Sequence, residues 1–264
     1  MKISICSYTF NHLTSSGRMN AFGYLEASKY RYGLQAVEIW NETLESLDEA
    51  YLAGVKDGLT ERELVLACMC VDDAHIWEDD AEAREANYRN ALDHLRAAEA
   101  LGARSVRIDA GGGGQDPAWT DEQFDEIVKR YREYAQRAYD NGYRVGPENH
   151  WGPETVPANM KRLCEAVDSP AFGVLLHAGR WNGNDAEKGD ETIVPWVMHT
   201  HLTPRLSDDA LARTMTMLRE AGYEGTYSVE MNAARYTEVA VLLARIRDVG
   251  AQWRLADRAS TLMA

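Results

Sequence analysis

The sequence predicts a single (β/α)8 TIM barrel, and three observations lead to this fold class. The chain of 264 residues has the length usual for one barrel, and no Pro/Ser-rich linker divides it. Runs of strand type recur about every thirty residues, which is the room that one strand, one helix and two loops need. Several helical segments are followed by glycine just before the next strand, as at Gly102 and Gly142. We expect one domain over residues 1–264, with a short C-terminal tail from about residue 253.

Eight apolar runs of strand type supply the predicted strands. In chain order they are Lys2–Tyr8, Leu34–Trp40, Leu64–Val71, Ser105–Asp109, Tyr143–Glu148, Phe172–His177, Trp196–Leu202 and Thr226–Met231. The segments between them have helical period, most clearly Asp80–Leu101, where Leu95 and Ala98 belong to one apolar stripe. Eight consecutive strand–helix units close most naturally into a barrel.

A doubly wound open sheet is the alternative fold. It is disfavoured because the first strand is not followed by a glycine-rich dinucleotide fingerprint. The glycine run Gly111–Gly114 lacks both the GxGxxG pattern and a Walker lysine, so we interpret it as a flexible loop at the active site.

Composition excludes several classes of partner. The formal net charge of −14 opposes binding to nucleic-acid backbones. We expect a cytoplasmic protein with no membrane contact, because the N-terminus lacks a signal-peptide pattern and no run of eighteen apolar residues occurs. The four cysteines lack zinc-type spacing and are expected to be reduced and mostly buried.

Four of the predicted strands each end in a candidate metal ligand. These are Glu148, His177, His201 and Glu230, and each closes an apolar run. The carboxyl ends of barrel strands gather catalytic groups, so two carboxylates and two imidazoles are expected to converge on one divalent ion. His199 is on the same strand as His201 but further from its end, so we expect it to be a hydrogen-bonded core histidine.

A mixed oxygen and nitrogen donor set limits the choice of metal. It suits Mn²⁺, Co²⁺, Fe²⁺ or Zn²⁺ better than Ca²⁺ or Mg²⁺, which prefer oxygen ligands. Mn²⁺ is our first choice, and Mg²⁺ stays among the alternatives. Such an ion stabilises the enediolate that forms when a base removes a proton α to a sugar carbonyl. We therefore expect proton-transfer chemistry on a carbohydrate.

The motifs of this chain resemble those of the xylose-isomerase-like TIM-barrel superfamily of sugar-phosphate isomerases and epimerases. They are Glu148-Asn149-His150-Trp151-Gly152, Val37-Glu38-Ile39-Trp40 upstream, and the stretch from Ala221 to Glu230 downstream. The resemblance implies one divalent ion held by glutamate, aspartate, histidine and glutamate at the ends of strands five to eight. Glu148, His201 and Glu230 match three of these ligands, and His177 stands where the family usually has aspartate.

The departure at His177 has two consequences. An imidazole there leaves the site one negative charge less anionic, which favours a borderline ion over a hard one, or it reflects loss of the metal. Three residues further on, Arg180 replaces the family's Asn or His that contacts substrate. Its guanidinium suits a phosphate, a carboxylate or a phenolate, and the alternative is a surface arginine on a loop.

The resemblance also implies catalytic roles. Epimerases of the superfamily use the two ligand glutamates, here Glu148 and Glu230, as acid and base on opposite faces of the substrate. In related lyases that cleave 3-oxo C-glycosides, the histidine at the position of His150 is the base. The alternative for His150 is a residue that orients Glu148.

Further candidates are expected around the mouth of the site. Glu38, Arg107, Trp151 and Arg180 are expected to bind substrate, with His75 and Asp109 nearby. Arg107 and Asp109 share one face of a strand, so they can also simply pair with each other. Trp40, Trp151 and Trp181 can form an aromatic wall that suits a sugar ring or a flavonoid aglycone.

Three functions stay open at this point. The first is a metal-dependent sugar isomerase or epimerase. The second is a lyase, either an inosose-type dehydratase or a C-deglycosidase subunit, and the third is a barrel that has lost catalysis. An apurinic-site endonuclease on the same barrel is disfavoured by the acidic charge. The expected partners are a sugar or sugar derivative, together with further copies of the chain or a small second subunit.

Overall fold

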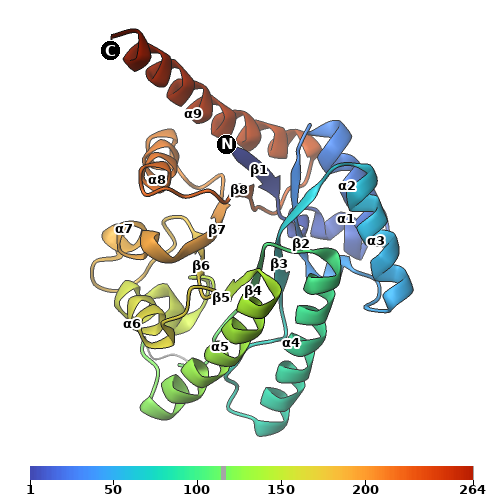
Figure 1. The fold of residues 1–264 in the computed structure, drawn as a ribbon, viewed down its shortest axis with the longest axis vertical. Coiled ribbons are helices and arrows are strands. Elements are labelled where there is room, and N and C mark those ends of the chain that lie inside the picture. The colour runs from blue at the N-terminus through green and yellow to red at the C-terminus, as the bar shows by residue number, and fades with distance from the viewer. Residues whose placement is uncertain (114–116, 264) are drawn as a thin grey trace.

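Eight parallel strands form the centre of the molecule, one for each predicted strand. The computed structural model describes residues 1–113 and 117–263. The strands are β1 (Lys2–Ile5), β2 (Ala36–Trp40), β3 (Val65–Val71), β4 (Ser105–Ile108), β5 (Arg144–Gly146), β6 (Val174–His177), β7 (Val197–Leu202) and β8 (Thr226–Val229). Helices surround them (Figure 1). They are α1 (Asn11–Ser15), α2 (Ala21–Glu26), α3 (Glu49–Glu61), α4 (Ala81–Leu101), α5 (Asp121–Asn141), α6 (Pro157–Val167), α7 (Gly189–Ile193), α8 (Asp208–Glu220) and α9 (Tyr236–Met263).

The strands form two four-stranded parallel sheets whose edges meet. One sheet has the order β1-β8-β7-β6 and the other β2-β3-β4-β5. Isolated bridges connect β5 to β6 at Val145–Phe172 and Glu148–Leu175, and β1 to β2 at Cys6–Glu38. These contacts close the two sheets into the predicted (β/α)8 barrel.

A tyrosine side chain takes the place of part of the backbone ladder between β1 and β2. The hydroxyl group of Tyr24, from α2, accepts a hydrogen bond from the Glu38 amide at 3.1 Å. It donates its own proton either to the carbonyl oxygen of Ile5 or to that of Glu38, and the second of these oxygens is 2.9 Å away. Tyr24 is fully buried. This side of the barrel is therefore closed through α2 as well as by strand pairing.

Close backbone approach explains a glycine pair on the opposite side of the barrel. A Cβ atom on Gly146, at the end of β5, would lie 1.8 Å from the carbonyl oxygen of Gly173. Only glycine fits at such a contact. The hydrogen bond from the Gly173 amide to the Val145 carbonyl, at 3.1 Å, can form because this side chain is missing.

Several strand ends differ from the sequence prediction by one or two residues, and two boundaries differ by more. β1 ends at Ile5 instead of Tyr8, because Ser7–Phe10 turns into a 3₁₀ helix. The segment from about residue 253, which we set apart as a tail, continues α9 without a break. Trp253 donates its indole N–H to Thr216 at 3.1 Å, and the end of α9 projects beyond the barrel (Figure 1).

The predicted glycine loop follows β4. Gly111, Gly112 and Gly113 all have positive φ, and the Gly113 amide donates to Gln123 at 3.3 Å. Gly114 lies outside the described residues. Within the described part of the chain, no helix combines the length and apolar character needed to cross a membrane.

Candidate metal centre and its cavity

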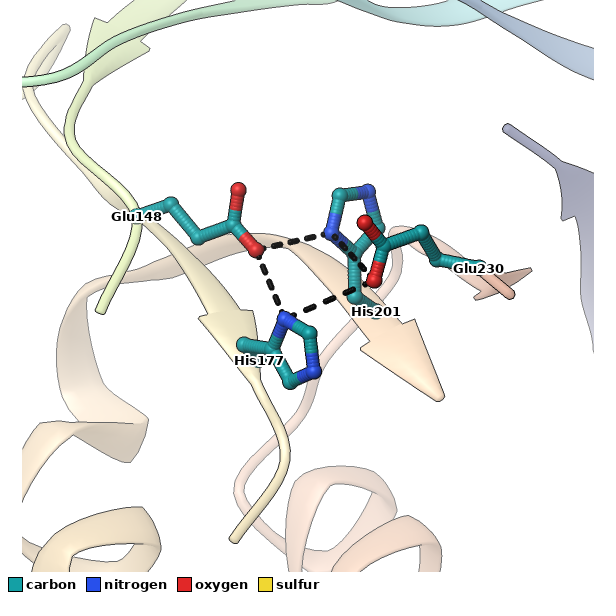
Figure 2. Close-up of side chains that lie close together, drawn as sticks. All are labelled: Glu148, His177, His201 and Glu230. Carbon is teal, nitrogen blue, oxygen red and sulfur yellow. Dashed lines mark hydrogen bonds and ion pairs between the residues drawn. The ribbon is translucent and has the colours of Figure 1, made fainter. Parts of the chain in front are cut away.

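The four predicted metal ligands meet at the carboxyl end of the barrel. Glu148 and Glu230 follow β5 and β8, while His177 and His201 lie at the ends of β6 and β7. One ligand atom from each lies within 4.8 Å of the others. Figure 2 shows all four side chains pointing toward one another. The structure therefore brings together the four residues that the sequence analysis selected as candidate ligands.

The imidazole Nδ1 atoms and the carboxylate oxygens face a common point. Glu148 Oε1 lies 2.8 Å from the Nδ1 atoms of both His177 and His201. Glu230 Oε2 lies 3.6 Å from the first of these nitrogens and 3.8 Å from the second. Burial tends to raise the pKa of Glu148, but the nearby His201 and His150 hold it well below its usual range. Glu148 is therefore ionised.

The second nitrogen of His201 is held by Glu38. Glu38 Oε1 lies 2.6 Å from His201 Nε2, and Oε2 lies 2.8 Å from His199 Nε2. Ser228 also donates to Oε2. A carboxylate at Nε2 fixes the tautomer that leaves the Nδ1 lone pair free for a ligand, which is the usual support of a metal-binding histidine.

This arrangement corrects the role expected for Glu38. Its carboxylate is fully buried beneath the ligand cluster and does not line the cavity. We reassign Glu38 from substrate contact to support of His201, because its oxygens already accept hydrogen bonds. His199 is the buried, hydrogen-bonded histidine that the sequence predicted.

Asn149 holds the backbone of the loops that carry the ligands. Its Oδ1 accepts from the His177 amide at 2.7 Å, and its Nδ2 donates to the carbonyls of His177 and Arg180 at 2.9 and 3.0 Å. Asn149 is fully buried. The central residue of the Glu148–His150 motif therefore ties the end of β5 to the end of β6.

A cavity of about 420 Å³ opens above the ligand cluster. Its walls include His177, His201 and Glu230, together with His150, Arg107 and Arg180. Of the predicted aromatic wall, Trp40 and Trp151 line the cavity. Trp181 is not part of the lining, and its indole N–H donates to Asp190 at 2.7 Å. His75 also lies outside this cavity and pairs with Glu78.

His150 lies between the ligand cluster and the aromatic wall. Its ring stacks on Trp151 with centroids 4.3 Å apart, and its Nδ1 lies 3.6 Å from Glu148 Oε2. Burial, with the charges of Arg107 and Arg180, lowers the pKa of His150 to about 4, although Glu148 opposes this shift. The imidazole is neutral at pH 7, but its pKa lies further from neutrality than a general base near the operating pH would require.

Arg107 is an ionic link between the cavity wall and the candidate metal ligands. Its Nη1 donates to Asp72 Oδ1 at 2.8 Å and to Asp109 Oδ2 at 3.2 Å, and its Nε lies 3.5 Å from Glu148 Oε2. The predicted pairing with Asp109 is therefore present. Asp109 Oδ1 also accepts from the Glu148 amide at 3.1 Å.

Several cavity residues were not predicted from the sequence. They are Cys6, Tyr8, Cys70, Asp72, Thr203, Pro204, Arg205, Met231 and Asn232. Asp72 follows β3 directly and accepts the indole N–H of Trp40 at 2.7 Å. The strand-end rule that identified Glu148 would also have found Asp72. Arg205 lies in a loop after β7, where no sequence pattern marks it.

The residues at the cluster fit a divalent cation. Two carboxylates supply two negative charges, and two imidazoles supply neutral donors whose Nδ1 atoms face the same point. Glu148 Oε2 is buried and makes no hydrogen bond to any described residue. Burial tends to lower the pKa of His201, but Glu38, Glu148 and Glu230 raise it well above its usual value, so a cation bound at Nδ1 would have to displace a proton.

The fold and the cluster together define a (β/α)8 barrel with a candidate metal centre at the carboxyl ends of β5 to β8. Residues 27–248 match the sequence model of the family described as xylose isomerase-like TIM barrel. The chain belongs to this family, as the motif resemblance indicated. No curated protein matches the chain at a significant level of sequence similarity.

Solved structures share the fold at low sequence identity. The chain is similar to the probable 3-DHS dehydratase AsbF from Bacillus anthracis, with 16% identity, a TM-score of 0.72 and coverage of 94% of this chain and 98% of that one. It is similar to a D-psicose 3-epimerase at 15% identity, a TM-score of 0.71 and coverage of 97% and 99%. For 3-keto-D-glucoside 4-epimerase from E. coli, the identity is 17%, the TM-score 0.69 and the coverage 89% and 94%.

Proposed function

We propose that this protein is a divalent-metal-dependent isomerase or epimerase that removes a proton α to the carbonyl of a sugar. The observation that carries the proposal is the convergence of Glu148, His177, His201 and Glu230 within 4.8 Å at the base of a cavity. Epimerases that act on D-psicose and on a 3-keto-D-glucoside have similar folds, which supports a carbohydrate substrate.

One Mn²⁺ ion is the proposed cofactor, with Co²⁺, Fe²⁺, Zn²⁺ or Mg²⁺ as alternatives. When bound, a divalent ion polarises the substrate carbonyl and lowers the cost of removing the adjacent proton. The donor set favours the borderline ions, because His177 supplies nitrogen where an aspartate would supply oxygen.

The chain's own groups bind the substrate and move the proton. His150 is neutral, borders the cavity and lies beside Glu148, so it can accept a carbon-bound proton. Glu230 lies on the other side of the cluster and is the second candidate, because burial raises its pKa and favours its proton-carrying form. Arg107, Trp151 and Arg180 line the cavity and are proposed to contact the sugar.

A lyase acting on an oxidised sugar is the second candidate function. Trp40 and Trp151 line the cavity, and His150 stacks on Trp151, so a planar aglycone has aromatic surface next to the candidate base. A dehydratase also has a similar fold. A C-deglycosidase or an inosose-type dehydratase would use the same proton abstraction and then expel a leaving group.

A barrel without catalysis is the third candidate, motivated by His177 in place of aspartate. Metal analysis of the purified protein separates it from the other two. The barrel without catalysis would be favoured if protein from cells grown with Mn²⁺ contains less than one divalent ion per chain. The purified protein should then also fail to bind added Mn²⁺, Co²⁺ or Zn²⁺.

Proton NMR in D₂O tests the leading proposal. The metal-loaded protein is mixed with a panel of ketoses, inososes, their phosphates and 3-oxo-glycosides. We expect deuterium to enter at one carbon next to a carbonyl, and the product identifies isomerisation, epimerisation or elimination. The protein treated with chelator is the control. No exchange with any member of the panel, despite bound metal, would contradict the proposed proton abstraction.

A further inference from the structure

The barrel interior below the metal centre is lined by polar and thiol side chains. Barrels of this class usually fill this space with layers of valine, isoleucine and leucine. Here the interior contains five polar or thiol residues that are each at most 2% exposed, namely Cys6, Cys68, Cys70, Glu38 and His199. Cys70 donates its thiol to Glu38 Oε1 at 3.0 Å. Part of this network supports His201, but Cys68 and His199 do not contact the outer ligands in any described hydrogen bond.

Three of these side chains form a second, inner group of candidate ligands. Glu38 from β2, Cys68 from β3 and His199 from β7 each bring a ligand atom within 4.8 Å of the other two. Glu38 Oε2 and His199 Nε2 are 2.8 Å apart. The outer cluster contains no sulfur, whereas this inner group combines sulfur, nitrogen and oxygen.

Charge and donor type both favour a thiophilic divalent ion. The two positive charges of a divalent ion are balanced by one carboxylate and one thiolate, and the imidazole is neutral. Burying this neutral assembly costs less free energy than burying an ion whose charge is not compensated. Thiolate and imidazole ligands select Zn²⁺ and similar ions over Mn²⁺ or Mg²⁺. The inner group therefore differs from the outer one in the metal that it favours.

An approach to the inner group exists at the opposite end of the barrel. His199 lines a cavity of about 630 Å³ whose other walls include Ile3, Ala36, Ala67 and Thr226. These residues lie at or near the amino ends of strands, away from the carboxyl ends that carry the outer cluster. An ion can therefore approach His199 without passing through the proposed substrate cavity.

We propose that Glu38, Cys68 and His199 form a second metal site, inside the barrel, that binds a thiophilic divalent ion such as Zn²⁺. Binding forms a metal–sulfur bond and releases the thiol proton of Cys68 to solvent. Glu38 keeps its contact with His201 through Oε1 and offers Oε2 to the inner ion. The site shares none of the four outer ligands, and Glu38 connects the two groups through its contact with His201.

Cd²⁺ is a probe for the candidate groups that contain a thiol, and the group of Cys6, Glu38 and His201 is the alternative to the inner site. The bond of Cd²⁺ to a thiolate gives an ultraviolet charge-transfer absorption, and the outer cluster has no thiol to produce one. We expect the chelator-treated full chain to develop this band on titration with Cd²⁺, saturating at one thiolate-bound ion per chain. Glu230→Gln should weaken the outer site and leave the band unchanged.

Matched cysteine variants identify the ligand. Cys68→Ser should abolish the band, while Cys6→Ser and Cys164→Ser should retain it. Cys164 is the matched control, because it is also a buried thiol but belongs to α6 and not to the inner group. With Cys68 intact, His199→Gln should weaken Cd²⁺ binding by at least about tenfold. Far-UV circular dichroism of each variant separates loss of the ligand from loss of the fold.

Two results would overturn the inner site. The first is a wild-type protein without the band at saturating Cd²⁺. The second is a band that survives in folded Cys68→Ser or disappears in folded Cys6→Ser, which would assign the thiol ligand to another cysteine. Either result leaves the proposed sugar chemistry standing, because that proposal depends on Glu148 and Glu230 and is tested by deuterium exchange.

Discussion

At the scale of single residues, the two carboxylate oxygens of Glu148 have different partners. Oε1 faces the Nδ1 atoms of His177 and His201, whereas Oε2 faces Arg107 and His150 at 3.5 and 3.6 Å. The same side chain therefore connects the candidate metal ligands to the candidate base. Substitutions at this residue should affect both metal binding and chemistry.

Glu148→Gln and Glu230→Gln should each weaken Mn²⁺ binding by at least about tenfold, because each removes an anionic ligand. Both variants should stay folded. Isothermal titration with Mn²⁺ measures the effect, and Glu187→Gln, an exposed glutamate on the loop after β6, is the control. Wild-type affinity in both ligand variants would reject the assignment.

His150→Ala should bind Mn²⁺ normally but slow α-proton exchange by about 10²–10⁴, the usual contribution of a general base. Because its pKa is lowered to about 4, the base form should persist as pH falls and disappear only near pH 4. Exchange rates measured from pH 4 to 8 check this. An exchange rate in His150→Ala equal to that of the wild type would transfer the role to Glu148 or Glu230.

His177→Asp should keep the metal site and shift its preference toward Mn²⁺ and Mg²⁺ relative to Zn²⁺, since a carboxylate oxygen is a harder donor than imidazole nitrogen. Competition titrations between Zn²⁺ and Mn²⁺ in wild type and variant measure this shift. Identical preference in the two proteins would place His177 outside the metal's ligands.

The strand-end rule predicts the four residues that the structure brings together, but it places Glu38 in the cavity wrongly and overlooks Asp72. Glu38 lies two residues before the end of β2, so its side chain points into the barrel beneath the cavity. His199 also lies before the end of its strand, and it is buried and hydrogen-bonded as its distance from the strand end predicts. Asp72 follows β3 directly and reaches the cavity. Distance from the strand end, more than residue type, decides which side chains reach the site.

At the scale of elements, the strand predictions succeeded because each apolar run is bounded by a helix end or a loop. The periodicity could not show where a strand changes into another conformation. Ser7–Phe10 continues the apolar run of β1 but forms a 3₁₀ turn, in which Ser7 accepts the Trp40 amide at 2.8 Å. A hydrogen bond between residues so far apart in sequence has no local signal.

Tyr24→Phe should destabilise the protein by about 2–3 kcal/mol, because it leaves buried backbone groups of Ile5 and Glu38 without a partner. Urea unfolding measures the loss. Tyr139→Phe, at an exposed position on α5, is the matched control and should have little effect. Equal stability of the two variants would show that the Tyr24 hydroxyl does not support the closure of the barrel.

At the scale of the whole molecule, stability depends on acidic groups that the fold buries. Glu154 is fully buried, and its Oε1 accepts from the Ala110 amide at 2.7 Å while Oε2 has no hydrogen-bond partner among the described residues. Burial, reinforced by the charge of Asp109, raises the pKa of Glu154 well above its usual value. The folded state therefore binds this proton more tightly than the unfolded state does.

The sign of this shift predicts how Glu154→Gln behaves. Glu154 contributes most to the stability of the wild type below pH 4.5, the pKa of this carboxyl group in the unfolded chain. The contribution is lost as the pH rises through the higher pKa of Glu154 in the folded state. Glutamine keeps an oxygen for the Ala110 amide and carries no charge. The variant should melt at a higher temperature than wild type at pH 8, with the difference vanishing near pH 4. Calorimetry at both values checks this, and a constant difference would contradict it.

The position of β1 in the barrel has a consequence for synthesis on the ribosome. Its regular ladder partner is β8, through pairs such as Lys2–Thr226 and Ile5–Val229, and its other edge meets β2 through the Tyr24 hydroxyl. Among the strands of the barrel, β1 is made first and must therefore wait for β8, the last, before its backbone is fully paired. Until then it is an unsatisfied edge, and docking of α2 offers its earliest protection from pairing with other nascent chains.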